Sequence, residues 1–404
     1  MGVTPRGLDI VCVGFAEWDT ELWTNQHHLM ARLAPHNRVL FVESLGLRRP
    51  TASGRDLRRI ARRLVTGLRP PRRVASPHGG EVRVVSPLVL PFHGSAAVRR
   101  INGVVLPALV RRAMRRAFTG SRGRRVLWAY VPQADLLLDA VEPDIVLYHC
   151  VDDIAAQDGV DAPSFRAAEA RILDRADLVL ASAPSLAERL RPHTRRLLFA
   201  PNVADTALFA TARDDGPEDP ALAHLPHPRI VFTGAIAAKK LDLELLTGLA
   251  HARPDWSIVL VGPVGLGDTS TDVRDLEALP NVHLPGPRTY AGLPAVLRAA
   301  DAALIPYRRS PLTDAVFPMK VYEYLAAGLP VVATPLPSIS AVREITVAAD
   351  ARATVEALEE VLARDDEQRR DARSAAAAAH SWDARLEEIT GALEEITDAH
   401  QEAS

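Results

Sequence analysis

The chain has 404 residues, of which 48% are apolar and 24% are charged, and its formal net charge is −2. This length is enough for two α/β domains with separate cores, and the composition excludes a fold that depends on disulfides or a structural metal. The two cysteines, Cys12 and Cys150, lie in apolar strand-like runs, so we expect buried free thiols, no metal site and a reducing cytoplasm.

The charge is divided unevenly along the chain. Residues 1–200 carry 30 Arg, no Lys and 19 acidic residues, a net charge of +11, whereas residues 201–404 carry 18 basic and 31 acidic residues, a net charge of −13. Two interpretations of the Arg-rich runs 48–73 and 99–125 stay open. They are a solvated helical face in a chain whose codons favour Arg, or a surface that attracts anionic lipid or a lipid-diphosphate acceptor.

These patterns also set expectations for partners and location. The Arg-rich runs lack interleaved aromatic residues, so we expect no nucleic acid as partner. The first apolar run, in MGVTPRGLDIVCVGF, is too short for a signal or membrane-spanning helix. We therefore expect a cytoplasmic protein, with peripheral contact at the inner face of an anionic membrane under the second interpretation of the arginines.

The first predicted elements form a β-loop-α-β unit. LDIVCVGF predicts a buried strand that ends at Gly14, the next stretch predicts a helix capped by Thr24 or Asn25, and RVLFVES predicts the second strand. Ligands of such sheets lie at the carboxyl ends of the strands. The candidates for substrate contact at this rim are Gly14, Glu17, Trp18, Trp23, Asn25, Gln26 and His27. For His27 the alternative is a helix-start histidine with no chemistry.

Residues 81–118 predict a strand and a long helix. EVRVVSPLVLPF is a strand that breaks at Pro87 and Pro91, and a basic amphipathic helix follows from Ala96 to about Phe118. We expect the apolar stripe of this helix to be buried, and the stripe consists of Val98, Ile101, Val104, Val105, Leu109 and Met114.

Two further strands, RVLWAYVP and PDIVLYHCVDD, follow, and the second ends in the polar residues His149, Asp152 and Asp153. A buried strand has no need of polar residues, so this cluster calls for an explanation. Either His149 and an Asp face a ligand in a cleft between two domains, or the two aspartates cap the next segment.

The middle of the chain predicts a domain boundary. ADLVLASAPSLAERL predicts a strand, a Ser cap and a helix. A later stretch rich in Pro and charge predicts a linker over residues 209–228, between an N-terminal domain of residues 1–208 and a C-terminal domain of residues 229–380. Residues 381–404 predict a final amphipathic helix, and its apolar stripe consists of Trp382, Leu386, Ile389, Leu393 and Ile396.

The second domain opens with strands that end in glycine. IVFTG predicts a buried strand that turns at Gly234, and SIVLVGPVG predicts the next, where Gly262 lets the backbone approach a nucleotide. Lys239 and Lys240 lie between these strands, just before a helix. With Lys320 they are the three lysines of a chain that otherwise uses Arg, so the pair stands out; a solvated surface pair is the alternative.

The stretch from Asp314 to Thr334, DAVFPMKVYEYLAAGLPVVAT, predicts one loop-helix-strand unit. Pro318 closes the loop, Lys320 and Glu323 lie on the helix, Gly328 ends the helix, and VVAT is a buried strand. We expect the loop amides to face outward and to form an anion site with the helix N-terminus, to which Lys320 adds its charge. One cation and one carboxylate, so placed, suit a diphosphate and a ribose; a solvated pair on a surface helix is the alternative.

PMKVYEYLAAGLPVVAT resembles the donor-site signature of GT-B glycosyltransferases of family 4 (group 1). The resemblance implies that Lys320 meets the donor phosphates and that Glu323 binds the ribose hydroxyls. It also implies donor contacts at Gly234, Lys239, Lys240, Gly262, Pro287, Arg308, Val316 and Phe317. The first acid of the usual E-x7-E pattern is absent, because position 315 is Ala315, with Asp314 beside it.

Two other segments carry the resemblance. APNVADTALF is similar to the family's P-N-G-V-D-x-x-x-F segment, without its Gly. YHCVDD is similar to the YDCVDD-like segment of family 4 transferases of bacterial polysaccharide synthesis, including the teichuronic acid pathway type, and has His149 in place of an Asp. Chains of this fold commonly send their last helix back to the first domain, and we expect residues 381–404 to do so.

The resemblance implies an α/β protein of GT-B fold, with two Rossmann-like doubly wound domains facing a central cleft. It implies a retaining glycosyltransferase that moves a sugar from a nucleotide-sugar donor, with a UDP-sugar favoured, to a hydroxyl of a glycan, lipid-linked or small-molecule natural-product acceptor. Lys320 and Lys240 would stabilise the leaving diphosphate, His149 would act at the sugar, and no metal or cofactor is expected. The alternatives are a nucleotide-sugar 2-epimerase of the same fold and a non-catalytic nucleotide-sugar-binding subunit.

Overall fold

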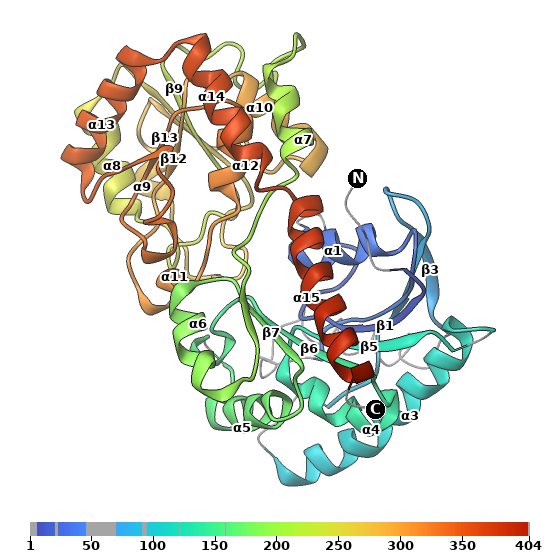
Figure 1. The fold of residues 1–404 in the computed structure, drawn as a ribbon. Helices are drawn as coiled ribbons and strands as arrows, with labels where there is room; N and C mark the ends of the chain where they lie inside the picture. The colour runs from blue at the N-terminus through green and yellow to red at the C-terminus, as the bar shows by residue number, and fades with distance from the viewer. Residues whose placement is uncertain are drawn as a thin grey trace. The chain divides into compact units, whose positions relative to one another are not determined.

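The computed structural model describes residues 6–20, 23–45, 70–90, 95–120, 122–157 and 159–402, without the side chains of the last three. The chain divides into two compact units (Figure 1). Unit 1 comprises Met1–Pro201 and Arg385–Ser404, and unit 2 comprises Asn202–Ala384. Most of the Arg-rich run 48–73 lies outside the described residues.

Within its described residues, unit 1 is built on an eight-stranded sheet in the order β3-β4-β2-β1-β5-β6-β7-β8. The strands are parallel except for β3, which pairs antiparallel with β4 at the edge. Their bounds are β1 Leu8–Val13, β2 Arg38–Val42, β3 Arg72–Ala75, β4 Glu81–Val85, β5 Arg124–Ala129, β6 Ile145–Cys150, β7 Leu178–Ala181 and β8 Leu197–Phe199. Strand β1 lies between β2 and β5, so the strand order reverses there, and the carboxyl end of β1 is the expected place for a ligand.

Helices flank this sheet and end where the sequence signals predicted. Their bounds are α1 Asn25–Leu33, α3 Ala96–Ala117, α4 Leu138–Val141, α5 Ala162–Leu173, α6 Pro184–Leu190 and α15 Trp382–Glu402. Helix α1 begins after Thr24, as predicted, whereas the N-cap of α6 is Ala183 rather than Ser182, whose hydroxyl donates to the Val151 carbonyl instead. The whole predicted apolar stripe of α15 is buried.

The prediction for the apolar stripe of α3 is wrong at three positions. Ile101 is 49% exposed, Val104 is 72% exposed and Val105 is 37% exposed. The helix instead packs through the opposite arc, which consists of Asn102, Leu106, Pro107, Val110, Ala113, Met114 and Ala117. Asn102 is satisfied there, because its side chain accepts from the Leu90 N–H at 3.0 Å and donates to the Leu90 carbonyl at 2.9 Å.

Unit 2 is described throughout and has a six-stranded parallel sheet in the order β11-β10-β9-β12-β13-β14. Its strands are β9 Arg229–Thr233, β10 Ser257–Val261, β11 Val282–His283, β12 Ala302–Ile305, β13 Val331–Ala333 and β14 Ile345–Val347. Its helices are α7 Thr206–Ala210, α8 Leu243–Ala252, α9 Arg274–Glu277, α10 Leu293–Arg298, α11 Pro311–Asp314, α12 Lys320–Ala326, α13 Ala351–Arg364 and α14 Glu367–Ala378. The order reverses at β9, so the carboxyl ends of β9, β10 and β12 position a second ligand site.

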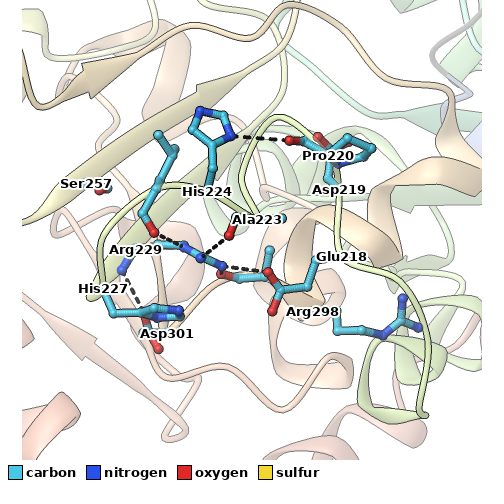
Figure 2. A network of polar contacts seen from close by, with 12 residues as sticks. Glu218, Asp219, Pro220, Ala223, His224, His227, Arg229, Ser257, Arg298 and Asp301 are labelled. Atoms are coloured by element: carbon cyan, nitrogen blue, oxygen red, sulfur yellow. Dashed lines mark hydrogen bonds and ion pairs between the residues drawn. The ribbon is translucent and has the colours of Figure 1, made fainter.

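Residues 209–228, predicted as a linker, pack inside unit 2. Leu222 is fully buried in its core, and Arg229, which is 3% exposed, holds the segment in place. The Arg229 guanidinium donates to the Leu225 and Ala223 carbonyls at 2.9 and 3.0 Å and to the Glu218 carboxylate at 2.7 Å (Figure 2). The chain instead passes between the units at residues 201–202 and 384–385.

The part of the chain that the structure covers contains neither a membrane-spanning helix nor a cluster of metal ligands. None of its helices is long and apolar enough to cross a membrane. No group of three or more His, Cys, Asp or Glu side chains is arranged to hold a metal ion among the same residues. Cys12 and Cys150 are buried free thiols, as predicted.

Candidate functional site

Two glycines at the strand ends of unit 2 bring the backbone and a lysine into close contact. Gly234 follows β9 and Gly262 follows β10. A Cβ atom on Gly262 would lie 1.8 Å from the Gly234 carbonyl oxygen, and one on Gly234 would lie 2.5 Å from Lys320 Cε. Neither position accepts a side chain, and the Lys320 side chain therefore lies against the end of β9.

Helix α12 carries the predicted cation and carboxylate. Pro318 precedes it, and Gly328, with a φ of +78°, ends it as the sequence predicted. Glu323 is 3% exposed and lies one turn after Lys320. Neither the Lys320 ammonium nor the Glu323 carboxylate forms a hydrogen bond or ion pair with any described residue. Glu323 is therefore not the solvated residue of the alternative interpretation.

The two groups influence each other's protonation. Burial raises the pKa of Glu323, and attraction to Lys320 offsets only part of that rise. For Lys320, burial alone would lower the pKa, but Glu323 and Tyr307 raise it above its ordinary value. Lys320 therefore stays charged at neutral pH, beside a carboxylate that burial disfavours in its ionised form.

The backbone amides of the loop before α12 differ in their contacts. The Val316 N–H donates to the Thr313 carbonyl at 3.2 Å, so the prediction that the loop amides face outward fails at Val316. The Phe317 N–H has no acceptor within the described ranges. The Phe317 ring stacks on Tyr322 at 5.4 Å, and its carbonyl accepts from the Asn202 side chain at 3.0 Å.

The other predicted donor residues lie in the surrounding loops. The Lys239 ammonium donates to the Gly267 carbonyl at 2.5 Å, so it is engaged within the protein. Lys240 is partly buried, and its ammonium has no acceptor among residues whose positions are given. The Arg308 N–H donates to the Lys240 carbonyl at 2.7 Å, which places this exposed arginine beside the lysine loop.

Two further residues, the predicted donor contact Pro287 and the acid Asp314, lie in loops of unit 2. Pro287 lies between Gly286, at a φ of +83°, and Arg288, which pairs with Asp219 at 2.6 Å. Asp314 lies 3.7 Å from Arg309 and ends α11.

Unit 1 brings two predicted residues and one unpredicted residue into a row. Gly14, Tyr130 and His149 lie at or just after the carboxyl ends of the neighbouring strands β1, β5 and β6. The His149 ring stacks on Tyr130 with centroids 4.8 Å apart. His149 is 2% exposed, and neither ring nitrogen has a hydrogen-bond partner within the described residues. Burial, and secondarily the charge of Arg385, lowers the pKa of His149 to about 3, so the ring is neutral at physiological pH.

The rings of Trp128 and Tyr130 lie 6.2 and 4.8 Å from the His149 ring. Among the residues that the structure covers, Trp128 Nε1, Tyr130 Oη and, further along the chain, Gln133 Oε1 are buried without a hydrogen-bond partner. Buried polar atoms are nearly always hydrogen-bonded, so such a group is typical of a place where ligand or ordered water completes the bonds. The prediction missed these residues, although Tyr130 and Gln133 follow a strand end in the same way as His149.

The two aspartates that follow His149 take part in local contacts. Asp152 accepts from the Gln157 amide at 2.8 Å, and Asp153 pairs with Arg166 at 2.6 Å. Arg166 also binds Glu169, which accepts from the Tyr148 hydroxyl. These contacts favour a structural role for both aspartates.

The predicted residues of the first loop are packed inside unit 1. Trp18 is 3% exposed, and its ring lies 5.0 Å from Phe41 and 5.5 Å from His27. His27 is fully buried, and its ring nitrogens contact the Glu17 carbonyl at 3.0 Å and the Thr24 hydroxyl at 3.2 Å, in agreement with the alternative that it is a helix-start residue. Asn25 is 3% exposed. Trp18, Asn25 and His27 are therefore buried, whereas Glu17 and Trp23 of the same predicted rim are only partly buried.

Comparisons with known proteins agree with this geometry. Residues 227–364 match the family model described as Glycosyl transferases group 1. TuaH of Bacillus subtilis (strain 168), named for teichuronic acid biosynthesis glycosyltransferase activity, is 33% identical over 232 residues, which are 54% of this chain and 57% of TuaH. The chain thus spans little more than half the length of the curated relative it matches.

Solved structures share the fold over nearly the whole chain. Sucrose-phosphate synthase from Thermosynechococcus elongatus is 17% identical with a TM-score of 0.67, and the match covers 98% of this chain and 100% of that one. Anabaena HepE, solved in complex with UDP-glucose, is 14% identical with a TM-score of 0.62, over 96% of this chain and 99% of HepE. The predicted GT-B fold is confirmed.

Proposed function

We propose that this chain is a glycosyltransferase of the group 1 type, and that it moves a sugar from a nucleotide-sugar donor to an acceptor hydroxyl with retention of configuration. The donor is a UDP-sugar, and the acceptor is a glycan, lipid-linked or small-molecule hydroxyl compound. TuaH, the relative at 33% identity, is named for a glycan pathway, and the neighbour HepE was solved with UDP and with UDP-glucose. The name of TuaH and the ligands of HepE support the choice of donor and acceptor class.

The observation that carries the proposal is the unpaired state of Lys320 and Glu323. Leaving a charge buried and unpaired costs several kcal/mol in effective terms, so folded proteins pair such groups or use them for ligands. The two groups attract each other, but neither forms a hydrogen bond or an ion pair with a described residue, and the Lys320 side chain lies against Gly234 at the end of β9. A diphosphate on Lys320 and a ribose on Glu323 would satisfy both charges.

The chemistry of such a site follows from its charges. The bond between the anomeric carbon and the diphosphate oxygen breaks, and negative charge builds on the departing diphosphate. Lys320, Lys240 and the Phe317 N–H, which has no acceptor among the described residues, stabilise that charge, which is electrostatic catalysis. The acceptor oxygen bonds to the anomeric carbon on the same face, and its proton passes to the departing diphosphate, so atoms and charges balance.

The properties of His149 favour a transferase over a 2-epimerase. An epimerase needs an acid and a base whose pKa values lie near the working pH. The pKa of His149 is lowered to about 3 by burial, and Asp152 and Asp153 are engaged with Gln157 and Arg166. We assign to His149 a neutral hydrogen-bonding contact with a sugar hydroxyl.

The test is to incubate the purified chain with UDP-, GDP- and dTDP-sugars and to follow binding, hydrolysis and exchange at C2. We expect one UDP-sugar to bind most tightly and to be hydrolysed slowly, with the released sugar first appearing in the anomeric configuration of the donor. Exchange at C2 would support the epimerase instead, and binding without turnover in the presence of an acceptor pool would support a non-catalytic subunit.

A further inference from the structure

Helix α3 turns aliphatic side chains toward solvent. Ile101, Val104 and Val105, here called the aliphatic patch, are 49%, 72% and 37% exposed. Their spacing of three and four residues places them on one side of the helix, opposite the arc that packs on the unit. Figure 1 shows α3 at the periphery of unit 1.

The same side of α3 becomes strongly basic toward its C-terminus. Arg112, Arg115 and Arg116, here called the basic end, are exposed and follow the aliphatic patch along the same arc. None of the three forms an ion pair with another residue whose position is given. By contrast, Arg99 pairs with Asp135 at 2.6 Å and Arg111 donates to the Asp139 carbonyl at 3.0 Å. The unit therefore engages Arg99 and Arg111 and leaves the basic end available.

We propose that the outward face of α3 docks on an anionic lipid surface. The aliphatic patch would enter the boundary between head groups and acyl chains, and the basic end would contact lipid phosphates. The long arginine stems suit this arrangement, because they lie along apolar surface while the guanidinium stays at the level of the phosphates. The chain would then be held beside lipid-linked molecules, whatever reaction it carries out.

The dimensions of the face favour a lipid surface over a protein partner. From Arg100 to Arg116 the face is about 24 Å long and about 10 Å wide, which is a few hundred Å² at most. A specific protein interface buries about 800 Å² on each partner. A membrane needs no matching groove and offers many anionic groups at once. A second copy, through the acidic residues 201–404, is the rival occupant.

Flotation of the full chain with lipid vesicles tests the proposal. We expect binding to vesicles of phosphatidylcholine with about 30 mol% phosphatidylglycerol at about 50 mM salt, little binding to phosphatidylcholine alone, and loss of binding at about 0.5 M salt. R112Q/R115Q should lower the bound-to-free ratio about 25-fold, because each arginine near an anionic surface contributes about fivefold. R274Q/R352Q, which removes the same charge from exposed positions of unit 2, should have no effect.

A second variant tests the aliphatic contribution separately. Replacing Val104, the most exposed residue of the aliphatic patch at 72%, by Ser should reduce vesicle binding and change the thermal midpoint little, because most of this side chain is already in contact with water. Equal binding to neutral and anionic vesicles, or equal loss in the unit 2 control, would overturn the proposal. A different pair of results would also overturn the proposal: no vesicle binding, and concentration-dependent dimers that the basic-end variant abolishes. That pair would indicate an interface between copies of the chain.

Discussion

Replacing Glu323 is the sharpest test of the donor site. Its carboxylate forms no hydrogen bond with a described residue, so the substitution removes no such bond within the protein and any loss of affinity reports on the ligand. If it accepts hydrogen bonds from two ribose hydroxyls at about 1.5 kcal/mol each, Glu323→Ala removes about 3 kcal/mol of binding free energy. This corresponds to a rise of more than about 100-fold in the Kd for the nucleotide-sugar. Isothermal titration with the best UDP-sugar of the panel measures it directly.

Replacing Glu323 should weaken donor binding but should stabilise the ligand-free protein. Burial raises the pKa of Glu323 above the ordinary value of 4.5. Above pH 4.5 the folded chain therefore holds this proton more often than the unfolded chain, and the contribution of Glu323 to stability falls as the pH rises through the raised pKa. At neutral pH the ionised side chain destabilises the ligand-free protein, so Glu323→Gln should raise the thermal midpoint.

The two measurements together separate a ligand site from a structural residue. A structural glutamate would lose stability when replaced, whereas a ligand-binding one should lose affinity and gain stability. Glu344→Ala, at an exposed position of unit 2, is the matched control and should change neither quantity. A Kd for Glu323→Ala within about twofold of the unmodified chain would refute the ribose assignment, and a lower thermal midpoint for Glu323→Gln would refute the argument from burial.

Three further predictions follow from single side chains. Lys320→Ala should lower kcat more than donor affinity, because charge builds on the departing diphosphate; an unchanged kcat would contradict this. In urea titrations, Arg229→Met should lower the free energy of unfolding by about 3–5 kcal/mol, because it strands the Glu218 carboxylate and backbone carbonyls, whereas exposed Arg274→Met should change it by less than about 0.5 kcal/mol. The His149 ring resonances should not titrate between about pH 5 and pH 8, since burial lowers its pKa to about 3; its contribution to stability is lost as the pH falls below 6.5, and a titration near 6.5 would refute the assignment.

The sequence predicted most where local signals and burial agree. The stretch 314–334 is an example, because each of its local signals indicates a single structure. A proline precedes the helix, Gly328 ends it and an apolar strand follows, and α12 and β13 lie at the predicted positions. The parallel strands of both units were equally clear, because strands buried on both faces read as continuous apolar runs. The edge strand β3, with the sequence RRVA, has no such pattern and was not predicted.

Composition alone did not predict correctly which segment links the two units. Residues 209–228 look like a linker because they are rich in Pro and charge, yet Arg229 binds their carbonyls and Asp219 pairs with Arg288. The first loop shows a related difficulty. The position after a strand end predicts ligand contact at Trp18 and His27, yet both rings pack on Phe41. A position along the chain does not show which neighbours will cover a side chain.

Helix α3 shows the limit of periodicity itself. Its sequence has two arcs with helical spacing, one through Ile101 and Val105 and one through Asn102, Leu106 and Val110, and hydropathy favoured the first. The structure buries the second, where the Asn102 side chain bonds to both backbone groups of Leu90. Which arc is covered therefore depends on a partner that the helix sequence does not contain. The exposed arc of α3 carries the aliphatic patch next to the unpaired arginines of the basic end. Exposure to water does not stabilise these side chains, whereas contact with an anionic lipid surface would bury the aliphatic groups and pair the arginines with phosphates.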